Sequence, residues 1–229
     1  PKQVMKKLLS IVFCSIIFIT AKSQVYVQAG VNLSNITTSQ PSQTQKNSSI
    51  TTFNAGVFDR FNIKGPLSFE TGLLFDGKGS KARINLSEED AYTASFDPFY
   101  IEVPANLVYQ FTFPKKMKLF IDAGPYLAVG IFGQTKSNGN IGGVNIVSET
   151  GINFSSANAN DNDVAYSDLK RFDYGFNVGA GLDFRTIFFK VNYSFGLSQL
   201  NVNQIDPAST DKNKYQTASV SLGIPIKYL

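Results

Sequence analysis

The sequence predicts an all-β chain that forms an eight-stranded antiparallel up-and-down transmembrane β-barrel. Three observations lead to this fold class. Downstream of Gln24 no helical period persists, whereas apolar and polar residues alternate with a period of two. The alternating segments are eight in number, and each can cross a bilayer as a tilted strand, which takes about 9–11 residues. Long and short connections alternate between successive segments.

The alternation is clearest in Tyr100–Phe113, where every second residue from Ile101 onward is apolar. The last three segments alternate in the same way, and the other four resemble them. Asp59 is the main exception, because it falls on an otherwise apolar face. In chain order the predicted strands are Val25–Leu33, Phe53–Ile63, Leu67–Gly77, Tyr100–Phe113, Leu119–Ile131, Phe172–Phe184, Phe189–Leu197 and Ala218–Tyr228.

The second face of these strands indicates which side of the sheet meets lipid. It is small and polar, rich in Gly, Asn, Ser and Asp, whereas the wet face of a soluble sheet commonly carries Lys, Glu and Thr. Small polar side chains suit the interior of a narrow barrel, and a continuous apolar face suits lipid. Closure is then required, because unpaired backbone groups in hydrocarbon cost several kcal/mol each. A soluble sandwich or a lipocalin-like barrel is the alternative.

The lengths of the connections predict an orientation. Short connections follow the second, fourth and sixth strands, at 64–66, 114–118 and Arg185–Thr186. Long connections follow the first, third, fifth and seventh strands, at Ser34–Thr52, Lys78–Phe99, Phe132–Arg171 and Ser198–Gln216. Outer-membrane barrels have short periplasmic turns and longer extracellular loops. We therefore expect an outer-membrane location, with four long loops outside the cell and both termini in the periplasm.

The first 23 residues have the plan of a secretory signal peptide. Met5-Lys6-Lys7 is followed by an apolar run and by Ala21-Lys22-Ser23, a small-x-small cleavage site. Residues 1–4 precede the start at Met5, and the barrel domain spans 24–229. The apolar run is too short for a spanning helix, although a retained anchor is the alternative. Cleavage leaves 17 of the 21 basic residues against 17 acidic residues, so no basic surface for nucleic acid remains.

The composition excludes several kinds of chemistry. The chain has no His and one Cys, so it lacks the usual general base, the Ser-His and Cys-His pairs and a thiolate zinc site. We therefore expect neither an enzyme nor a cofactor or metal site. Two alternatives stay open: acid/base catalysis by Glu102 and Asp122 on adjacent strands, and calcium binding by the Asn- and Asp-rich loop 158–163.

Charged residues of both signs fall on the inward face. We interpret them as a lumen polar network of paired charges that plugs the barrel, since unpaired charges there would be costly. A small ion-conducting path is the alternative. The expected network consists of Arg60, Glu70, Asp76, Lys78, Glu102, Asp122, Asp173, Asp183, Lys190 and Lys227.

Aromatic residues gather near the strand ends on the apolar face. Outer-membrane barrels carry girdles of such residues at both membrane interfaces, so we assign them to the lipid interface. They are Phe53, Tyr109, Phe111, Phe113, Phe172, Tyr174, Phe184, Phe189 and Tyr228.

Six short stretches lie along the predicted strands: Gly30-Val31-Asn32-Leu33-Ser34, Phe69 to Phe75 with Lys78-Gly79, Tyr100 to Pro104, Ala123 to Tyr126, Phe172 to Gly175 and Gly179 to Gly181. In these stretches the chain resembles a known family, the PorT-like or porin-family outer-membrane β-barrels of Bacteroidota-type Gram-negative bacteria. The resemblance covers nearly all of the chain after Ser23. It implies an eight-stranded outer-membrane barrel, and a few members serve type IX protein secretion.

Two function hypotheses follow. The first is a non-enzymatic barrel that acts as a membrane anchor, a scaffold for surface loops or an accessory subunit of an envelope or secretion complex. Its expected partners are outer-membrane lipid, the barrel-assembly machinery during insertion, and other envelope or type IX secretion proteins. The second hypothesis is a porin-like channel for small solutes or ions.

Overall fold

The computed structural model describes residues 23–39, 48–85, 91–113, 117–141, 144–155, 168–198 and 212–228. Within these ranges no helix is long and apolar enough to cross a membrane. The described residues form the strands β1 (Ser23–Ser39), β2 (Ile50–Lys64), β3 (Leu67–Gly77), β4 (Ser80–Asn85), β5 (Ala91–Thr112), β6 (Lys118–Ile141), β7 (Val144–Gly151), β8 (Asn153–Ser155), β9 (Asp168–Lys170), β10 (Phe172–Asp183), β11 (Phe188–Gly196) and β12 (Lys212–Tyr228).

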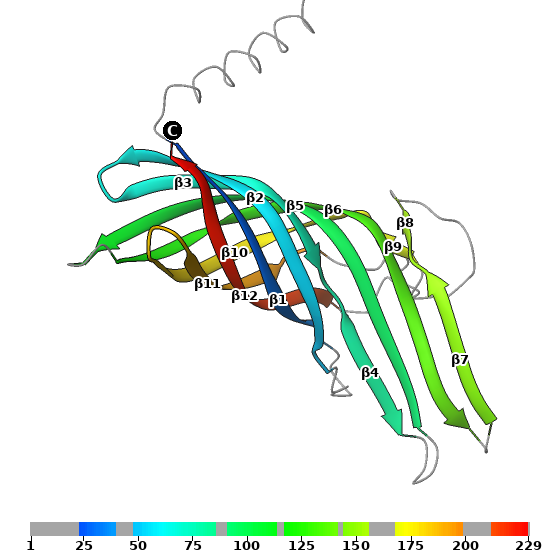
Figure 1. Cartoon of the computed structure of the whole chain (residues 1–229). Helices are drawn as coiled ribbons and strands as arrows, with labels where there is room; N and C mark the ends of the chain where they lie inside the picture. Colours follow the sequence, from blue (N-terminus) through cyan, green and yellow to red (C-terminus); the bar gives the residue numbers. More distant parts are fainter. Residues whose placement is uncertain are drawn as a thin grey trace, which may run out of the picture.

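Eight of the strands close into a barrel (Figure 1). Around the ring the order is β5, β3, β2, β1, β12, β11, β10 and β6, and β6 pairs with β5 to complete it. Every neighbouring pair in the ring is antiparallel. Each predicted strand lies inside one ring strand or coincides with it to within one residue, so the predicted fold class is confirmed.

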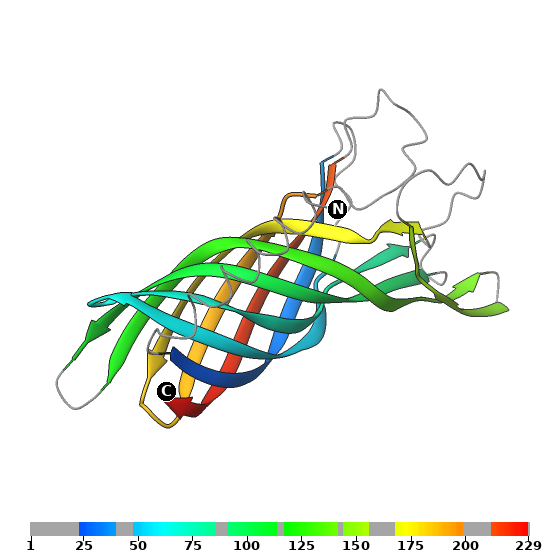
Figure 2. The same cartoon turned by 90° about the horizontal axis from the view of Figure 1, so that it is seen from above.

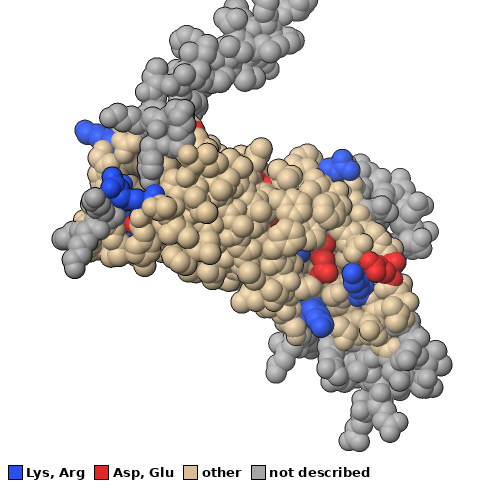
Figure 3. Space-filling model, in the orientation of Figure 1, with Lys and Arg blue, Asp and Glu red and all other residues tan. Residues whose placement is uncertain are grey.

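The strands place apolar side chains outside and polar ones inside. In β10 exposed and buried residues alternate without a break, with Val178 facing out and Asn177 facing in. Figure 3 shows the result: few charged side chains lie over the middle of the barrel, whereas Lys, Arg, Asp and Glu gather towards its two ends. The face in this view is thus an apolar band with charged margins, and the exposed Val, Leu, Ile and Phe side chains of all eight ring strands continue the apolar surface, as a bilayer requires.

The short turns lie together at one end of the barrel, and strand ends from the longer connections lie at the other (Figures 1 and 2). Gly65 has a φ of 56° in the β2–β3 turn, a conformation that glycine adopts without steric cost. Arg185 has a φ of 72° in the β10–β11 turn, where its backbone N–H donates to Asp183 Oδ1 at 2.7 Å. Gln24 pairs with Tyr228, so the described chain both begins and ends at the turn end.

Two of the long connections contain strands that the sequence pattern did not predict. β5 starts at Ala91 instead of Tyr100, and β6 continues to Ile141 instead of ending at Ile131. β4 pairs with the start of β5, and β7 pairs with the end of β6. The result is a four-stranded sheet in the order β4-β5-β6-β7 that projects beyond the barrel (Figures 1 and 2). We call it the extension sheet.

The extension sheet lacks the apolar–polar alternation by which the other strands were predicted, and the reason is physical. Along the end of β6, Gln134, Lys136 and Asn138 are exposed on one face, and Gly133, Thr135 and Ser137 lie on the other. Neither face is apolar, so no hydrophobic alternation marks the strand. Cross-strand hydrogen bonds to β5 and β7 hold it instead.

Candidate functional site

The barrel interior collects most of the buried charge of the described residues. Arg60, Glu70, Asp76, Lys78, Glu102, Asp122, Asp173, Asp183 and Lys190 lie there, and each is 5% exposed or less. Eight of them form two clusters, and Asp183 lies apart at the turn end. The side chain of Lys227 lies outside the described part of the structure.

The first cluster lies nearer the turn end and contains Arg60, Glu70, Asp122 and Lys190; we call it the turn-side cluster. Arg60 donates to Glu70 Oε2 through Nε at 2.9 Å and Nη2 at 2.6 Å. Lys190 Nζ lies 3.1 Å from Glu70 Oε1 and 2.9 Å from Asp122 Oδ1. Both oxygens of Glu70 are therefore paired with cations, which offsets the cost of burying this carboxylate.

The second cluster lies nearer the opposite end and contains Asp76, Lys78, Glu102 and Asp173; we call it the loop-side cluster. Lys78 Nζ lies 2.9 Å from Asp173 Oδ2, 3.1 Å from Glu102 Oε2 and 3.7 Å from Asp76 Oδ2. Ser198 donates a short hydrogen bond to the other oxygen of Asp173. A single ammonium group thus faces three carboxylates.

Aromatic rings surround the same ammonium group. Lys78 Nζ lies 4.3 Å from the ring centroid of Tyr126, 5.4 Å from that of Tyr100 and 5.9 Å from that of Tyr215. Tyr126 also donates to Asp173 Oδ2 at 3.1 Å. These cation–π contacts add to the ion pairs and fix the Lys78 side chain inside the barrel.

A group of aromatic and aliphatic side chains packs beside the turn-side cluster. Tyr26 stacks on Phe58 at 5.2 Å and meets Phe188 edge-on at 4.8 Å. Phe120 meets Phe188 at 6.0 Å and lies 4.7 Å from the Arg60 guanidinium. The expectation of a small and polar inward face is therefore wrong in part, because large rings also fill the lumen.

Glycines on neighbouring strands make room for these rings. A Cβ atom on Gly223 would lie 2.0 Å from Cζ of Phe188, and one on Gly181 would lie 2.3 Å from Cζ of Phe120. A Cβ atom on Gly175 would lie 2.6 Å from the Tyr126 ring. Large and small residues thus alternate across the interior, which is how small barrels fill their lumen. This pairing of inward aromatic and inward glycine residues is the signal that could have located the rings from sequence.

The segment after β7 covers the end of the barrel beside the loop-side cluster. Phe154 meets the Tyr100 ring edge-on at 5.6 Å, and its own ring lies over Gly130. Ile152 is buried, packs over Gly133 and donates its backbone N–H to the Gly133 carbonyl oxygen at 2.9 Å. Gly130 and Gly133 of β6 thus leave the space into which Phe154 and Ile152 pack.

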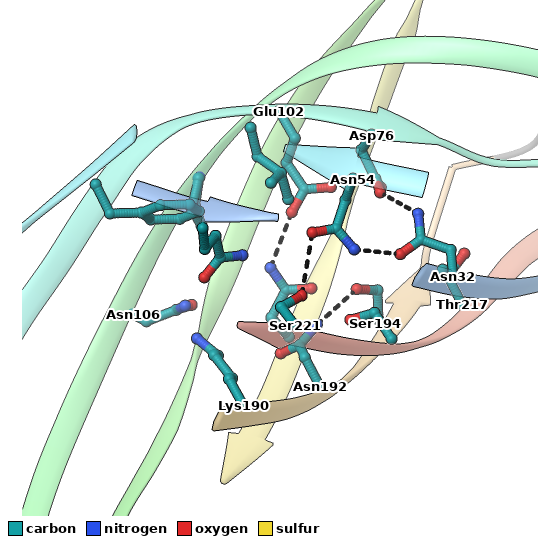
Figure 4. Close-up of a pocket in the computed structure, with 16 residues that line it drawn as sticks. Asn32, Asn54, Asp76, Glu102, Asn106, Lys190, Asn192, Ser194, Thr217 and Ser221 are labelled. Carbon is teal, nitrogen blue, oxygen red and sulfur yellow. Dashed lines mark hydrogen bonds between the residues drawn. The ribbon is translucent and has the colours of Figure 1, made fainter. Parts of the chain in front are cut away.

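A polar cavity of about 30 Å³ lies between the two clusters (Figure 4). Amide side chains dominate its wall, including Asn32, Asn54, Asn106 and Asn177. Asn32 donates to Asp76 Oδ1 at 2.7 Å, and Asn54 donates to Asn32 Oδ1 at 2.6 Å. This cavity therefore has room for one or two water-sized groups.

The structure separates the two carboxylates that could have formed a catalytic pair. Glu102 is bound to Lys78 in the loop-side cluster, whereas Asp122 is bound to Lys190 in the turn-side cluster. The Asn- and Asp-rich loop 158–163 lies outside the described residues. Among the residues that the structure describes, no group of three or more His, Cys, Asp or Glu side chains could hold a metal ion.

The outer surface carries the aromatic residues expected at the lipid interface. Phe53, Tyr109, Phe111, Phe113, Phe172, Tyr174, Phe184 and Phe189 all face outward and are 41% to 64% exposed. The side chain of Tyr228 lies outside the described part of the structure.

A row of phenylalanine rings crosses β2, β3, β5 and β6 just below the extension sheet. The centroids lie 5.6 Å apart for Phe53 and Phe75, 5.1 Å for Phe75 and Phe99, and 5.0 Å for Phe99 and Phe132. Two residues further along both strands, towards the extension sheet, the cross-strand pair on the same face is polar, with Asp97 opposite Gln134. The row therefore ends the apolar surface on this side of the barrel.

Comparisons with known proteins give a family and a set of distant likenesses. The family model described as outer membrane protein beta-barrel domain matches residues 20–202. No curated protein sequence is similar enough to this chain to be matched. Among solved structures, neisserial surface protein A (NspA) is 13% identical, with 87% of this chain and 96% of that chain covered and a TM-score of 0.39.

Two further solved structures are also distantly similar. Ail, the attachment invasion locus protein of Yersinia pestis, solved in complex with the heparin analogue sucrose octasulfate, is 12% identical, with 90% and 99% of the two chains covered and a TM-score of 0.39. The N-terminal β-barrel domain of OprF from Pseudomonas aeruginosa is 9% identical, with 90% and 100% covered and a TM-score of 0.30.

Proposed function

The chain belongs to the outer membrane protein beta-barrel domain family, and we propose that it is a closed, non-enzymatic barrel that anchors the extension sheet at the cell surface. In this role it is a scaffold for surface contact or an accessory subunit of an envelope or secretion complex. The observation that carries the proposal is a lumen bridged by two charge clusters, with a cavity of about 30 Å³ between them.

The packing of the lumen favours an anchor over a channel. A conducting path needs a continuous water-filled route with sites that bind ions weakly enough to release them. Here Lys78 and Lys190 each pair with more than one carboxylate, and Tyr26, Phe58 and Phe188 fill the turn end. The absence of His from the sequence supports the non-enzymatic part of the proposal.

The proposal also covers the N-terminal segment and the orientation of the barrel in the membrane. We propose that residues 1–23 are a cleaved signal peptide, that the short turns and both termini are periplasmic, and that the extension sheet is extracellular. The motifs quoted above support a PorT-like member from a Bacteroidota-type bacterium. They also support outer-membrane lipid, the barrel-assembly machinery and type IX secretion proteins as partners.

Single-channel recording in planar bilayers tests the closed lumen. We expect the purified wild-type protein to give no sustained openings under conditions in which a general porin conducts. The proposal fails if openings persist after repurification and if their conductance changes in Lys190→Met, because only current through this lumen would respond to that substitution. The porin-like channel is then the correct reading.

Photo-crosslinking in native envelopes tests the scaffold role. A photoreactive residue at Val147, which is 76% exposed on β7, is compared with one at exposed Asn62 beside the β2–β3 turn. We expect a defined, saturable product from Val147 that is absent from Asn62. Identical products from both positions would contradict a contact specific to the extension sheet.

A further inference from the structure

Several buried oxygen atoms around the central cavity have no hydrogen-bond partner among the described residues. Asn106 Oδ1, Asn177 Oδ1, Asn192 Oδ1 and Gln28 Oε1 are all of this kind, and all four residues line the cavity. Asn106 is 2% exposed and Asn177 is 4% exposed. A buried oxygen without a partner is costly, because it has given up its hydrogen bonds to water, so a cavity lined by several of them calls for an occupant.

The orientation of two of these amides is fixed by their neighbours. Asn177 donates through Nδ2 to Glu102 Oε1 at 3.0 Å, and Asn106 donates through Nδ2 to Asp122 Oδ1 at 3.3 Å. An ionised carboxylate only accepts hydrogen bonds, so the NH₂ group of each amide must face it. The amide oxygen is then left on the other side without a partner, and both residues line the cavity. The wall therefore offers acceptors and no matching donors from these side chains.

The charge around the cavity is negative. The two clusters contain five carboxylates, on Glu70, Asp76, Glu102, Asp122 and Asp173, against three cations, on Arg60, Lys78 and Lys190. With all groups ionised, two negative charges remain in excess. Lys190 also lines the cavity, but its ammonium group is already held by Glu70 and Asp122. A positive charge in the cavity would reduce the imbalance.

We propose that the cavity binds one small dehydrated monovalent cation, such as Na⁺. Amide oxygens are hard ligands that replace the hydration shell of such ions, as backbone carbonyl oxygens do in selectivity filters. The volume of about 30 Å³ admits a bare ion with about one water molecule and excludes a bulky organic cation. A divalent ion is disfavoured, because calcium sites use free carboxylates and here the carboxylates face Lys78, Lys190 or Arg60.

The four proposed ligands come from separate parts of the ring, and Figure 4 labels two of them, Asn106 and Asn192. Asn106 is on β5, Asn177 on β10, Asn192 on β11 and Gln28 on β1. An ion bound by all four oxygens would tie these strands together from inside, at a level between the two charge clusters. The site is independent of the role at the cell surface, since it would serve a scaffold and a channel equally.

A crystal structure of the full-length mature protein grown in NaCl tests the proposal directly. We expect a density peak in the cavity with at least four oxygen ligands at distances below about 2.6 Å, shorter than most hydrogen bonds to water. Peaks at hydrogen-bond distances alone, with no oxygen closer than about 2.6 Å, would overturn the proposal.

Unfolding in matched salts adds a linkage test with defined variants. In NaCl the folded-to-unfolded ratio is expected to rise tenfold for each tenfold increase in Na⁺ above its Kd, whereas choline chloride at equal ionic strength has no such effect. Asn177→Leu and Asn106→Leu each remove one oxygen ligand and should abolish the difference between the salts. Asn138→Ala, at an exposed position of the extension sheet, should keep it. Equal stabilisation by both salts in the wild type would contradict the site.

Discussion

Lys190 and Glu70 form an ion pair across the full width of the barrel. Lys190 is on β11 and Glu70 is on β3, and these strands lie on opposite sides of the eight-membered ring, yet Nζ and Oε1 are 3.1 Å apart. The pair therefore closes the lumen at its level instead of lining a path beside it. Because Glu70 also binds Arg60, and Lys190 also binds Asp122, each charge in this bridge has more than one partner.

Replacing Lys190 by Met tests what this bridge contributes to stability. Lys190→Met leaves Asp122 buried without its cation, so we expect the free energy of unfolding to fall by about 3–5 kcal/mol. Lys136→Met is the matched control, because Lys136 pairs with Glu149 at 3.5 Å and both side chains are about half exposed. Its effect should stay below about 1 kcal/mol. Urea unfolding of the refolded protein in lipid vesicles measures both, and equal losses would contradict a bridge closed to water.

Gly223 and Phe188 test the fit between small and large residues in the lumen. They are directly opposed on β12 and β11, and the nearest atoms to a Cβ on Gly223 all belong to the Phe188 ring. We expect Gly223→Ala to lower the free energy of unfolding by about 1–3 kcal/mol through overpacking. The second substitution Phe188→Leu should recover part of that loss, because it removes the ring that the methyl group meets.

Gly151→Ala is the control for this experiment. Gly151 lies on β7, and nothing comes within 4 Å of a Cβ placed there. Its stability should change by less than about 0.5 kcal/mol. The interpretation would be wrong if the double variant were as unstable as the sum of both single losses, since coupled neighbours depart from additivity.

The barrel could be predicted because its chemistry repeats with the period of a strand. Alternation in β10 sorts Val178 to lipid and Asn177 to the lumen without ambiguity, and the same rule places Glu70 and Lys190 inside. It carries no information on which inward residues meet. The pairing of Glu70 with Lys190 depends on the ring order and on the tilt of the strands, which bring residues 120 positions apart into contact.

Alternation alone missed both the extension sheet and the aromatic filling of the lumen, and the reasons differ. Strands with two polar faces, such as the end of β6, lack the hydrophobic signal that marks the rest. Alternation puts Phe120 and Phe188 on the same face as Asp122 and Lys190, but the space for their rings depends on glycines of the neighbouring strands. Steric complementarity between strands is a property of the register, and alternation alone does not show it.

An arginine scan of the outer surface tests where the lipid begins. Val220 is 58% exposed, lies between Val31 and Val191 on its neighbouring strands and is far from both barrel ends. Val220→Arg should cost about 2–4 kcal/mol in vesicles, because a charged side chain near the bilayer midplane is poorly solvated. Gln134→Arg, beyond the phenylalanine row, should cost less than about 1 kcal/mol. Unfolding in the same vesicles compares the two, and equal costs would place the boundary elsewhere.

Labelling of single cysteines tests the proposed orientation. The sequence contains one cysteine, Cys14, within the segment that we propose is cleaved, so an introduced cysteine would be the sole thiol of the mature protein. We expect a membrane-impermeant maleimide to label Gln134→Cys on intact cells, because Gln134 is exposed on the extension sheet. Asn62→Cys is exposed at the opposite end, before the β2–β3 turn, and should be labelled only after the outer membrane is permeabilised.

Since both thiols are exposed in the folded barrel, a difference in labelling reports the side of the membrane and not the burial of the residue. If Asn62→Cys were labelled on intact cells and Gln134→Cys only after permeabilisation, the proposed orientation would be wrong and the extension sheet would lie in the periplasm.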